Sequence, residues 1–279
     1  MTGASPDRNV RKSTIAGTWY PGRASELTLA IAEFLSHVPS TVIDGRLVAL
    51  IAPHAGYVYS GQTAAYAYKQ LEGLDFDAVA IVSPVHRMSA GPVMVNDCEY
   101  YDTPLGLVEV DRGLVDALGR QTSLSRVEWD DEHSLEIQLP FLQHVLGDFK
   151  LLPVMQSEQG LLTSQALAGA LVAVLQGRRA LLVASTDLSH FHSYEVAKEL
   201  DSIASQAVAD YDPGALSKAV ERGTAEACGG GPVVTVMLAA QALGADRAEV
   251  LHYANSGDVT GDRARVVGYL AAALYQALE

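Results

Sequence analysis

The chain contains little cysteine. Only Cys98 and Cys228 occur among its 279 residues, and they lie far apart in the sequence. Two distant cysteines exclude the dense disulfide framework that stabilises small secreted proteins. We therefore expect each thiol to remain free for a chemical role.

The chain is also poor in basic residues, with 19 lysines and arginines against 33 aspartates and glutamates and a formal net charge of −14. Nucleic acids and anionic membranes both attract clustered positive charge, so the sequence argues against both as partners. No apolar run approaches the roughly 20 residues that span a bilayer. Residues 1–13 lack the apolar core of a signal peptide, so we expect a cytoplasmic protein.

Charged residues make up only 19% of the chain, whereas hydrophobic residues make up 49%. This balance excludes an intrinsically disordered chain and indicates a folded globular protein. The sequence has no internal repeat, no low-complexity tract and no proline- or glycine-rich linker. We predict a single domain over residues 13–279, preceded by a flexible N-terminal tail at residues 1–12.

Short apolar runs alternate with longer helical patterns, which predicts an α/β fold with a largely parallel central sheet sandwiched by helices. The predicted strands are nearly all apolar, as expected when both faces of a sheet are covered; they are residues 47–52, 78–83, 150–155 and 180–185. The predicted helices are residues 25–37, 61–71, 112–119, 134–146, 161–176, 194–210 and 232–243. Residues 93–110 are predicted to form a hairpin or excursion, and residues 249–253 and 264–274 two closing strands.

Polar side chains follow three of the predicted strands. His54 comes after the first strand, His86 after the second, and Asp187 with His190 after the fourth. Pro53 immediately precedes His54, and proline ends a strand because it lacks the N–H that a ladder needs. Because ligands bind beyond the carboxyl ends of strands in an open α/β sheet, we expect these side chains to converge on one crevice.

Each candidate also has a plain structural interpretation. A single histidine at a strand end is usually a hydrogen-bonded loop residue, and an isolated cysteine is usually a buried, inert thiol. Cys228, however, lies in the segment EACGGGP just before a predicted helix, where the helix dipole favours a thiolate. His133 and Glu136 can share one face of a helix start, either as a metal pair or as part of an acidic cap.

Seven segments carry a resemblance to a known family. They occur in the order typical of that family and extend over nearly the whole chain: AGTWYPG (16–22), APHAGYVYSG (52–61), SPVHR (83–87), DEHSLEIQLPFL (131–142), STDLSH (185–190), CGGGP (228–232) and YANSGDVTGD (253–262). Together they resemble the Memo family. The resemblance implies a fold similar to that of the class III extradiol ring-cleaving dioxygenases, with a crevice for one metal ion.

The resemblance also implies roles for the candidate residues. His54, His86 and Cys228 match the metal ligands, whereas Asp187 and His190 match polar residues beside them. We expect His190 to act as the catalytic acid or base and Asp187 to orient a ring nitrogen. The predicted substrate contacts are Tyr57, Asn255, His133 and Glu136.

A cysteine in place of the carboxylate of the ring-cleaving enzymes keeps the ligand charge but makes the site softer. We expect one transition metal ion, with Fe(II) first and zinc or copper as competitors. The predicted function is that of an iron-dependent, dioxygenase-like oxidoreductase acting on a small molecule or a modified residue. A non-catalytic module that binds a peptide or another ligand and a zinc-dependent hydrolase are the alternatives.

The resemblance further implies partners. Some bacterial and archaeal relatives are grouped with a radical-SAM protein and an AMMECR-type protein. Animal members carry an additional histidine where this chain has Ile15, and another where it has glycines at residues 229–231. Their peptide-binding role is therefore not expected to transfer directly to this chain.

Overall fold

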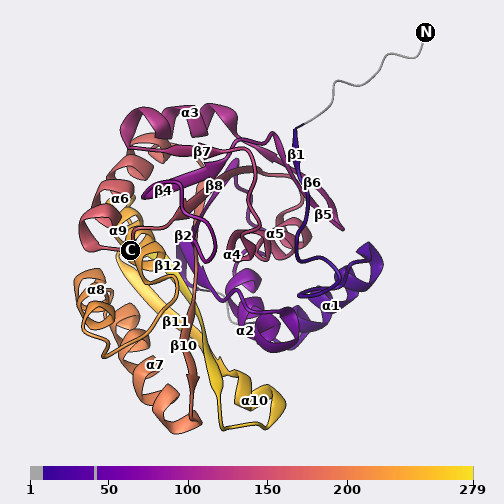
Figure 1. The fold of residues 1–279 in the computed structure, drawn as a ribbon, viewed down its shortest axis with the longest axis vertical. Coiled ribbons are helices and arrows are strands. Elements are labelled where there is room, and N and C mark those ends of the chain that lie inside the picture. The colour runs from indigo at the N-terminus through magenta and orange to yellow at the C-terminus, as the bar shows by residue number, and fades with distance from the viewer. Residues whose placement is uncertain (1–8, 41–42, 279) are drawn as a thin grey trace.

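The computed structural model describes residues 9–40 and 43–278. Across these residues twelve strands form one mixed sheet, in the order β1-β5-β6-β8-β3-β9-β2-β12-β10, with β4, β7 and β11 paired off this path (Figure 1). The strands are β1 (Val10–Arg11), β2 (Gly45–Ala52), β3 (Ala78–Pro84), β4 (Val93–Asn96), β5 (Tyr100–Thr103), β6 (Gly106–Val110), β7 (Ser125–Val127), β8 (Lys150–Gln156), β9 (Ala180–Ser185), β10 (Asp187–His192), β11 (Arg247–Asn255) and β12 (Val266–Ala277).

Helices cover both faces of the sheet, so the α/β fold predicted from the sequence is confirmed. They are α1 (Ala24–Ser36), α2 (Tyr57–Lys69), α3 (Arg112–Gln121), α4 (His133–Glu136), α5 (Leu139–Leu146), α6 (Leu161–Leu175), α7 (Tyr194–Ala209), α8 (Pro213–Glu221), α9 (Gly230–Ala242) and α10 (Ser256–Thr260). Figure 1 shows α3, α6 and α9 on one side of the central strands and α1, α2 and α5 on the other.

The centre of the sheet is parallel and mostly apolar. Strands β8, β3, β9 and β2 pair side by side in parallel, and nearly all of their residues are buried. Their carboxyl ends are in register, since Ala52 lies opposite Ser185 and Ser83 lies opposite Met155. The loops that follow these strands therefore start from the same edge of the sheet.

Helix α9 packs against β9, β3 and β2, whereas α2 packs against β12, β11 and β2. On the α2 side, the buried rings of Tyr68 and Phe141 stack with centroids 5.0 Å apart and hold α2 against α5. This two-sided cover removes the central strands from water. Their continuous apolar sequence is the physical result of that burial.

Three predicted elements differ in detail. The predicted helix 134–146 is divided into α4 and α5, because Pro140 lies at the start of α5 and has no N–H to continue a helix. Helix α2 begins at Tyr57, earlier than predicted, and Tyr57 donates its N–H to the Trp19 carbonyl at 2.8 Å. Residues 187–192 form strand β10 and residues 213–221 form helix α8, and neither element was among those predicted.

The flexible tail predicted for residues 1–12 was placed too far along the chain, since its last residues belong to the folded domain. Residues 1–8 lie outside the described residues. Val10 and Arg11 form strand β1, which pairs in parallel with β5. The Arg11 side chain is buried and forms ion pairs with Asp130 and Glu136, so the folded domain begins before residue 13. Within the residues described, no helix is both long and apolar enough to cross a membrane.

Candidate metal centre

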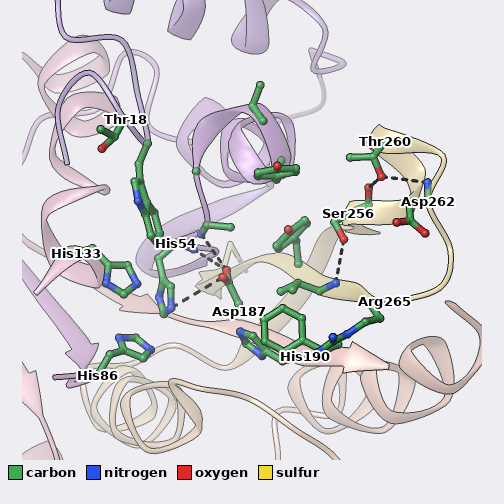
Figure 2. Close-up of a pocket in the computed structure, with 18 of the residues that line it drawn as sticks. Thr18, His54, His86, His133, Asp187, His190, Ser256, Thr260, Asp262 and Arg265 are labelled. Carbon is green, nitrogen blue, oxygen red and sulfur yellow. Dashed lines mark hydrogen bonds and ion pairs between the residues drawn. The ribbon is translucent and has the colours of Figure 1, made fainter. Parts of the chain in front are cut away.

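A cavity of about 870 Å³ lies at the carboxyl edge of the central strands. His54 enters it from the end of β2, His86 from the end of β3, and Asp187 and His190 from β10. Figure 2 shows the imidazoles of His54, His86 and His133 close together, with Asp187 beside His54. The structure therefore places the predicted strand-end residues in one cavity.

His54 is held in one orientation by Ser185. The Ser185 hydroxyl donates to the Ser134 carbonyl at 2.6 Å, so its oxygen accepts the Nδ1–H of His54 at 2.9 Å. This assignment leaves a lone pair on Nε2, which lies 3.1 Å from the Cys228 sulfur. Burial, followed by the neighbouring His133 and His86, holds the pKa of His54 well below its usual range, so the imidazole is neutral.

His86 is held in the same way by Glu132. One Glu132 oxygen accepts the backbone N–H of His86 at 2.6 Å, and the other lies 3.0 Å from its Nδ1. Burial acts to raise the pKa of Glu132, but its hydrogen bonds from His86 and Ser134 outweigh burial and keep the carboxylate ionised. An ionised carboxylate only accepts, so Nδ1 of His86 carries a proton, and Nε2 is the ring nitrogen left for a metal ion.

Cys228 comes directly before Gly229, which is the N-cap residue of α9. The Asp187 N–H donates to the Cys228 sulfur at 3.2 Å. Burial raises the pKa of the Cys228 thiol, and the negative charge of Asp187 adds to that rise. In the metal-free protein burial thus favours the protonated thiol, which opposes the thiolate expected at the helix start.

The donor set fits a transition metal. One ligand atom each from His54, His86 and Cys228 lies within 4.8 Å of the others. Two neutral imidazole nitrogens and one sulfur suit Fe(II), zinc and copper, whereas the oxygen-rich sites of calcium and magnesium look different. A divalent cation also favours the thiolate, so the raised pKa of the free thiol is compatible with metal binding.

His190 lies at the same cavity, and its geometry suits a proton acceptor. Its Nδ1 lies 2.8 Å from the Leu188 carbonyl, which only accepts, so Nδ1 carries the proton and Nε2 is free. Burial lowers the pKa of His190, so the ring is neutral near pH 7. In a regular strand, side chains an odd number of residues apart point to opposite faces of the sheet. A register shift in β10 between Asp187 and His190 allows both side chains to line the same cavity.

Asp187 contacts His54 and not the ring of His190. One carboxylate oxygen accepts the backbone N–H groups of His54 at 2.7 Å and Ala55 at 3.3 Å. The other oxygen lies 4.0 Å from the Nε2 of His54. Burial raises the pKa of Asp187 to about 7, which makes it a second group able to exchange a proton near neutrality.

His133 lines the cavity between two aromatic neighbours. Its ring stacks on His86 with centroids 4.7 Å apart and contacts the Trp19 indole at 4.4 Å. Burial lowers the pKa of His133 to about 4. His86, Glu132 and His133 also form a group with metal-ligand geometry, but Glu132 is already engaged by hydrogen bonds, so we interpret this group as a support for His86.

Three predicted substrate contacts do not line the cavity. Tyr57 is buried and donates its hydroxyl to the Ile137 carbonyl. Asn255 is buried and caps α10 by accepting the Gly257 N–H. Glu136 is buried and accepts hydrogen bonds from residues that include Arg11 and Tyr20. The Tyr57 hydroxyl, the Asn255 carbonyl oxygen and the Glu136 carboxylate are thus engaged in hydrogen bonds within the protein.

The sequence interpretation missed several residues of the site. Ser185 and Glu132 orient the two histidine ligands, and Trp19, Phe191 and Arg265 line the cavity. Glu132 and Ser185 lay inside the motifs DEHSLEIQLPFL and STDLSH, but they are 46 and 131 residues from the histidines that they orient, so only the folded chain shows the pairing. Nothing in the sequence pattern points to Arg265, which only the return of β12 brings to the cavity.

The comparisons with known proteins show the family of this chain. A family model described as "Memo-like protein" matches residues 11–273. The chain belongs to the Memo family. A MEMO1 family protein of Methanosarcina acetivorans is 37% identical over 267 residues, which cover 94% of this chain and 98% of that protein. A MEMO1 family protein of Nitrosopumilus maritimus is 33% identical and covers 93% of this chain and 98% of its own length.

A solved structure shares the fold of this Memo-family chain. The crystal structure of the uncharacterized protein JW3007 of Escherichia coli K12 matches with a TM-score of 0.52 and 14% identity. The match covers 81% of this chain and 99% of that one. At this identity the likeness concerns the fold alone, since one fold serves many chemistries.

Proposed function

We propose that this Memo-family protein is a mononuclear, iron-dependent oxidoreductase that acts on a small molecule. The observation that carries the proposal is the set of donor atoms from His54, His86 and Cys228, which lie within 4.8 Å of one another beside a cavity of about 870 Å³. Three protein ligands leave positions open on a metal ion, and the cavity gives a substrate access to them.

The protein's own hydrogen bonds support this assignment. Ser185 and Glu132 each hold one nitrogen of a histidine, so that the other nitrogen faces the Cys228 sulfur or the cavity without a competing proton. Such outer partners are typical of histidines that bind metals, because they set the tautomer and the ring orientation. The two histidine ligands are thus oriented before a metal arrives.

In the proposal, His190 takes a proton from a hydroxyl group of the substrate. Its Nε2 is the free ring nitrogen, and its lowered pKa keeps that nitrogen unprotonated near pH 7. Trp19 and His133 offer ring faces against which a planar substrate can stack. Fe(II), when bound, would supply the electron exchange with dioxygen that these side chains cannot provide.

Metal analysis of protein purified without oxygen tests the proposal. We expect the wild type to bind one Fe(II) per chain, and His54→Ala and Cys228→Ser to lose stoichiometric binding, because each variant lacks one of three ligands. His190→Ala should keep the metal and lose oxygen consumption with hydroxylated aromatic substrates. Co(II) loading gives a second measurement, since a sulfur-to-cobalt absorption band should disappear in Cys228→Ser.

His144→Ala is a matched control, because His144 lies on α5 and does not line the cavity. This variant should bind metal as the wild type does. Retention of full metal affinity by Cys228→Ser would contradict the ligand set. A wild type that binds no metal would favour the binding module, and stoichiometric zinc with hydrolysis but no oxygen consumption would favour the hydrolase.

A further inference from the structure

The cavity has an outer wall that the proposed metal chemistry does not use. Val58, Tyr59 and Phe191 line this wall and are 71%, 44% and 60% exposed. Arg265 lies on the same wall, and Figure 2 shows it near His190 and away from His86 and His133. Large exposed apolar side chains beside a free cation are a costly surface unless a ligand covers them.

Phe191 has an unusual backbone. Its φ is 63°, and among the described residues only Tyr211 shares a positive φ without being glycine. Phe191 is the additional residue in a bulge of β10, because His190 lies opposite Val267 and His192 lies opposite Val266. Left-handed backbone disfavours a bulky side chain, so strain at an exposed phenylalanine suggests a role for the ring itself.

Arg265 extends from the start of β12 across this ring. Its guanidinium carbon lies 5.2 Å from the centroid of the Phe191 ring, which is within the range of a cation–π contact. Among the described residues the structure shows no ion pair or hydrogen bond of the Arg265 guanidinium. The donors of the guanidinium are therefore available to a ligand in the cavity.

The neighbouring charges do not take the place of such a ligand. Arg87, the other arginine of the cavity, lies 3.5 Å from the Asp131 carboxylate and is already paired. Asp262 lines the cavity near Arg265, but its carboxylate accepts the Ala264 N–H at 2.9 Å and forms no ion pair with the guanidinium among the described residues. Among the described residues, Arg265 is thus the arginine of the cavity whose guanidinium contacts the Phe191 ring but has no charged or hydrogen-bonded partner.

We infer that Phe191 and Arg265 form a subsite for a planar small molecule that carries a carboxylate. The fork of a guanidinium matches a carboxylate in two parallel hydrogen bonds, and the flat faces of Phe191 and Tyr59 suit a planar body. A cavity of about 870 Å³ is the size of a small-molecule site. This inference names the class of substrate. It rests on the proposed function only in that both place the substrate in the same cavity.

The test compares 2-naphthoate with 2-naphthamide, which has nearly the same shape and no charge. Calorimetric titration of the full chain, both metal-loaded and after EDTA treatment, should give roughly tenfold tighter binding of the naphthoate in both forms, as expected for a charge-assisted hydrogen bond. Arg265→Gln should bring the ratio of the two affinities close to one. Phe191→Ala should weaken both ligands, because it removes the stacking face.

Arg87→Gln is the matched control, since it removes the same charge from the same cavity at an arginine that is already paired. It should keep the preference for the naphthoate. Equal binding of the two probes, no binding of naphthoate at millimolar concentration, or an equal loss in Arg87→Gln would overturn the subsite. Binding of naphthoate only to the metal-loaded protein would also overturn the subsite. If the protein binds no metal at all, the proposed function fails, but the preference of the EDTA-treated protein for naphthoate over naphthamide should remain.

Discussion

Phe191 shows how one residue can keep a conformation that its own side chain disfavours. Its positive φ arises where β10 has one more residue than the partner strand β12. The same bulge carries His190, whose ring must reach the cavity. The local cost at Phe191 is therefore tied to the position of the proposed base, which is a common place for strain in a protein.

Replacing Phe191 by glycine and by alanine separates backbone strain from the loss of the ring. Both variants lose the ring, but only glycine adopts a φ of 63° without penalty. We expect Phe191→Gly to be about 1 kcal/mol more stable than Phe191→Ala, which corresponds to roughly 2–4 °C in melting temperature. Thermal unfolding measures the difference, and a less stable glycine variant would argue against strain at this position.

Among the elements, the short strand β1 matters more than its two residues suggest. Arg11 donates to Asp130 at 2.8 Å and to the Glu132 carbonyl at 2.7 Å, and it also pairs with Glu136. These contacts hold the segment before α4, and that segment carries the carboxylate that orients His86. An apparently peripheral strand thus supports the metal centre through buried charges.

The pairing of β1 with α4 predicts a pH dependence. Burial acts to raise the pKa of Glu136, but the charge of Arg11 and hydrogen bonds from Ser13 and Thr14 hold it below its usual 4.5. Because the unfolded carboxyl group binds protons more readily, the stability from Glu136 is present above pH 4.5 and is lost as the pH falls through the folded pKa. Urea unfolding between pH 6 and pH 3 measures this acid limb.

Glu136→Gln is the matched variant for that measurement. It should cost roughly 3 kcal/mol at pH 7, because Arg11 stays buried with one partner fewer. The difference from the wild type should shrink below pH 4.5, where the wild type also loses this interaction. A difference that stays constant from pH 6 to pH 3 would show that Glu136 does not contribute through its charge.

At the scale of the whole molecule, the metal centre joins elements that are distant in sequence. His54 follows β2, His86 follows β3, and Cys228 precedes α9, so the ligands come from three segments that are far apart in sequence. A metal ion bound there would bind only the folded chain. Metal binding and unfolding are therefore coupled by mass action.

This coupling predicts that metal stabilises the protein. With free metal at about one hundred times its dissociation constant, the gain is about 2.7 kcal/mol, or roughly 5–10 °C in melting temperature. Treatment with EDTA should reverse the gain. Cys228→Ser should show no metal-dependent shift, and a shift as large as that of the wild type would contradict a role for the sulfur.

The sequence by itself determined the fold class, the family and the strand ends that carry the site. Continuous apolar runs mark strands that are covered on both faces, and a histidine directly after such a run stands out because the run excludes polar groups. His54, His86, His190 and Cys228 were found in this way or through family motifs. The parallel order of β2 and β3 brings His54 and His86 to the same edge, whereas His190 comes from β10 and Cys228 from the segment before α9.

Only the tertiary structure decided which of the other polar residues face the cavity. Tyr57, Asn255 and Glu136 lie inside the family motifs, yet their side chains form hydrogen bonds with the protein and do not line the cavity. Phe191 and Arg265 reach the cavity through a bulge and an antiparallel return of the chain. Register, bulges and hydrogen-bond partners depend on contacts between distant segments, and a linear pattern contains no distances from which to infer them.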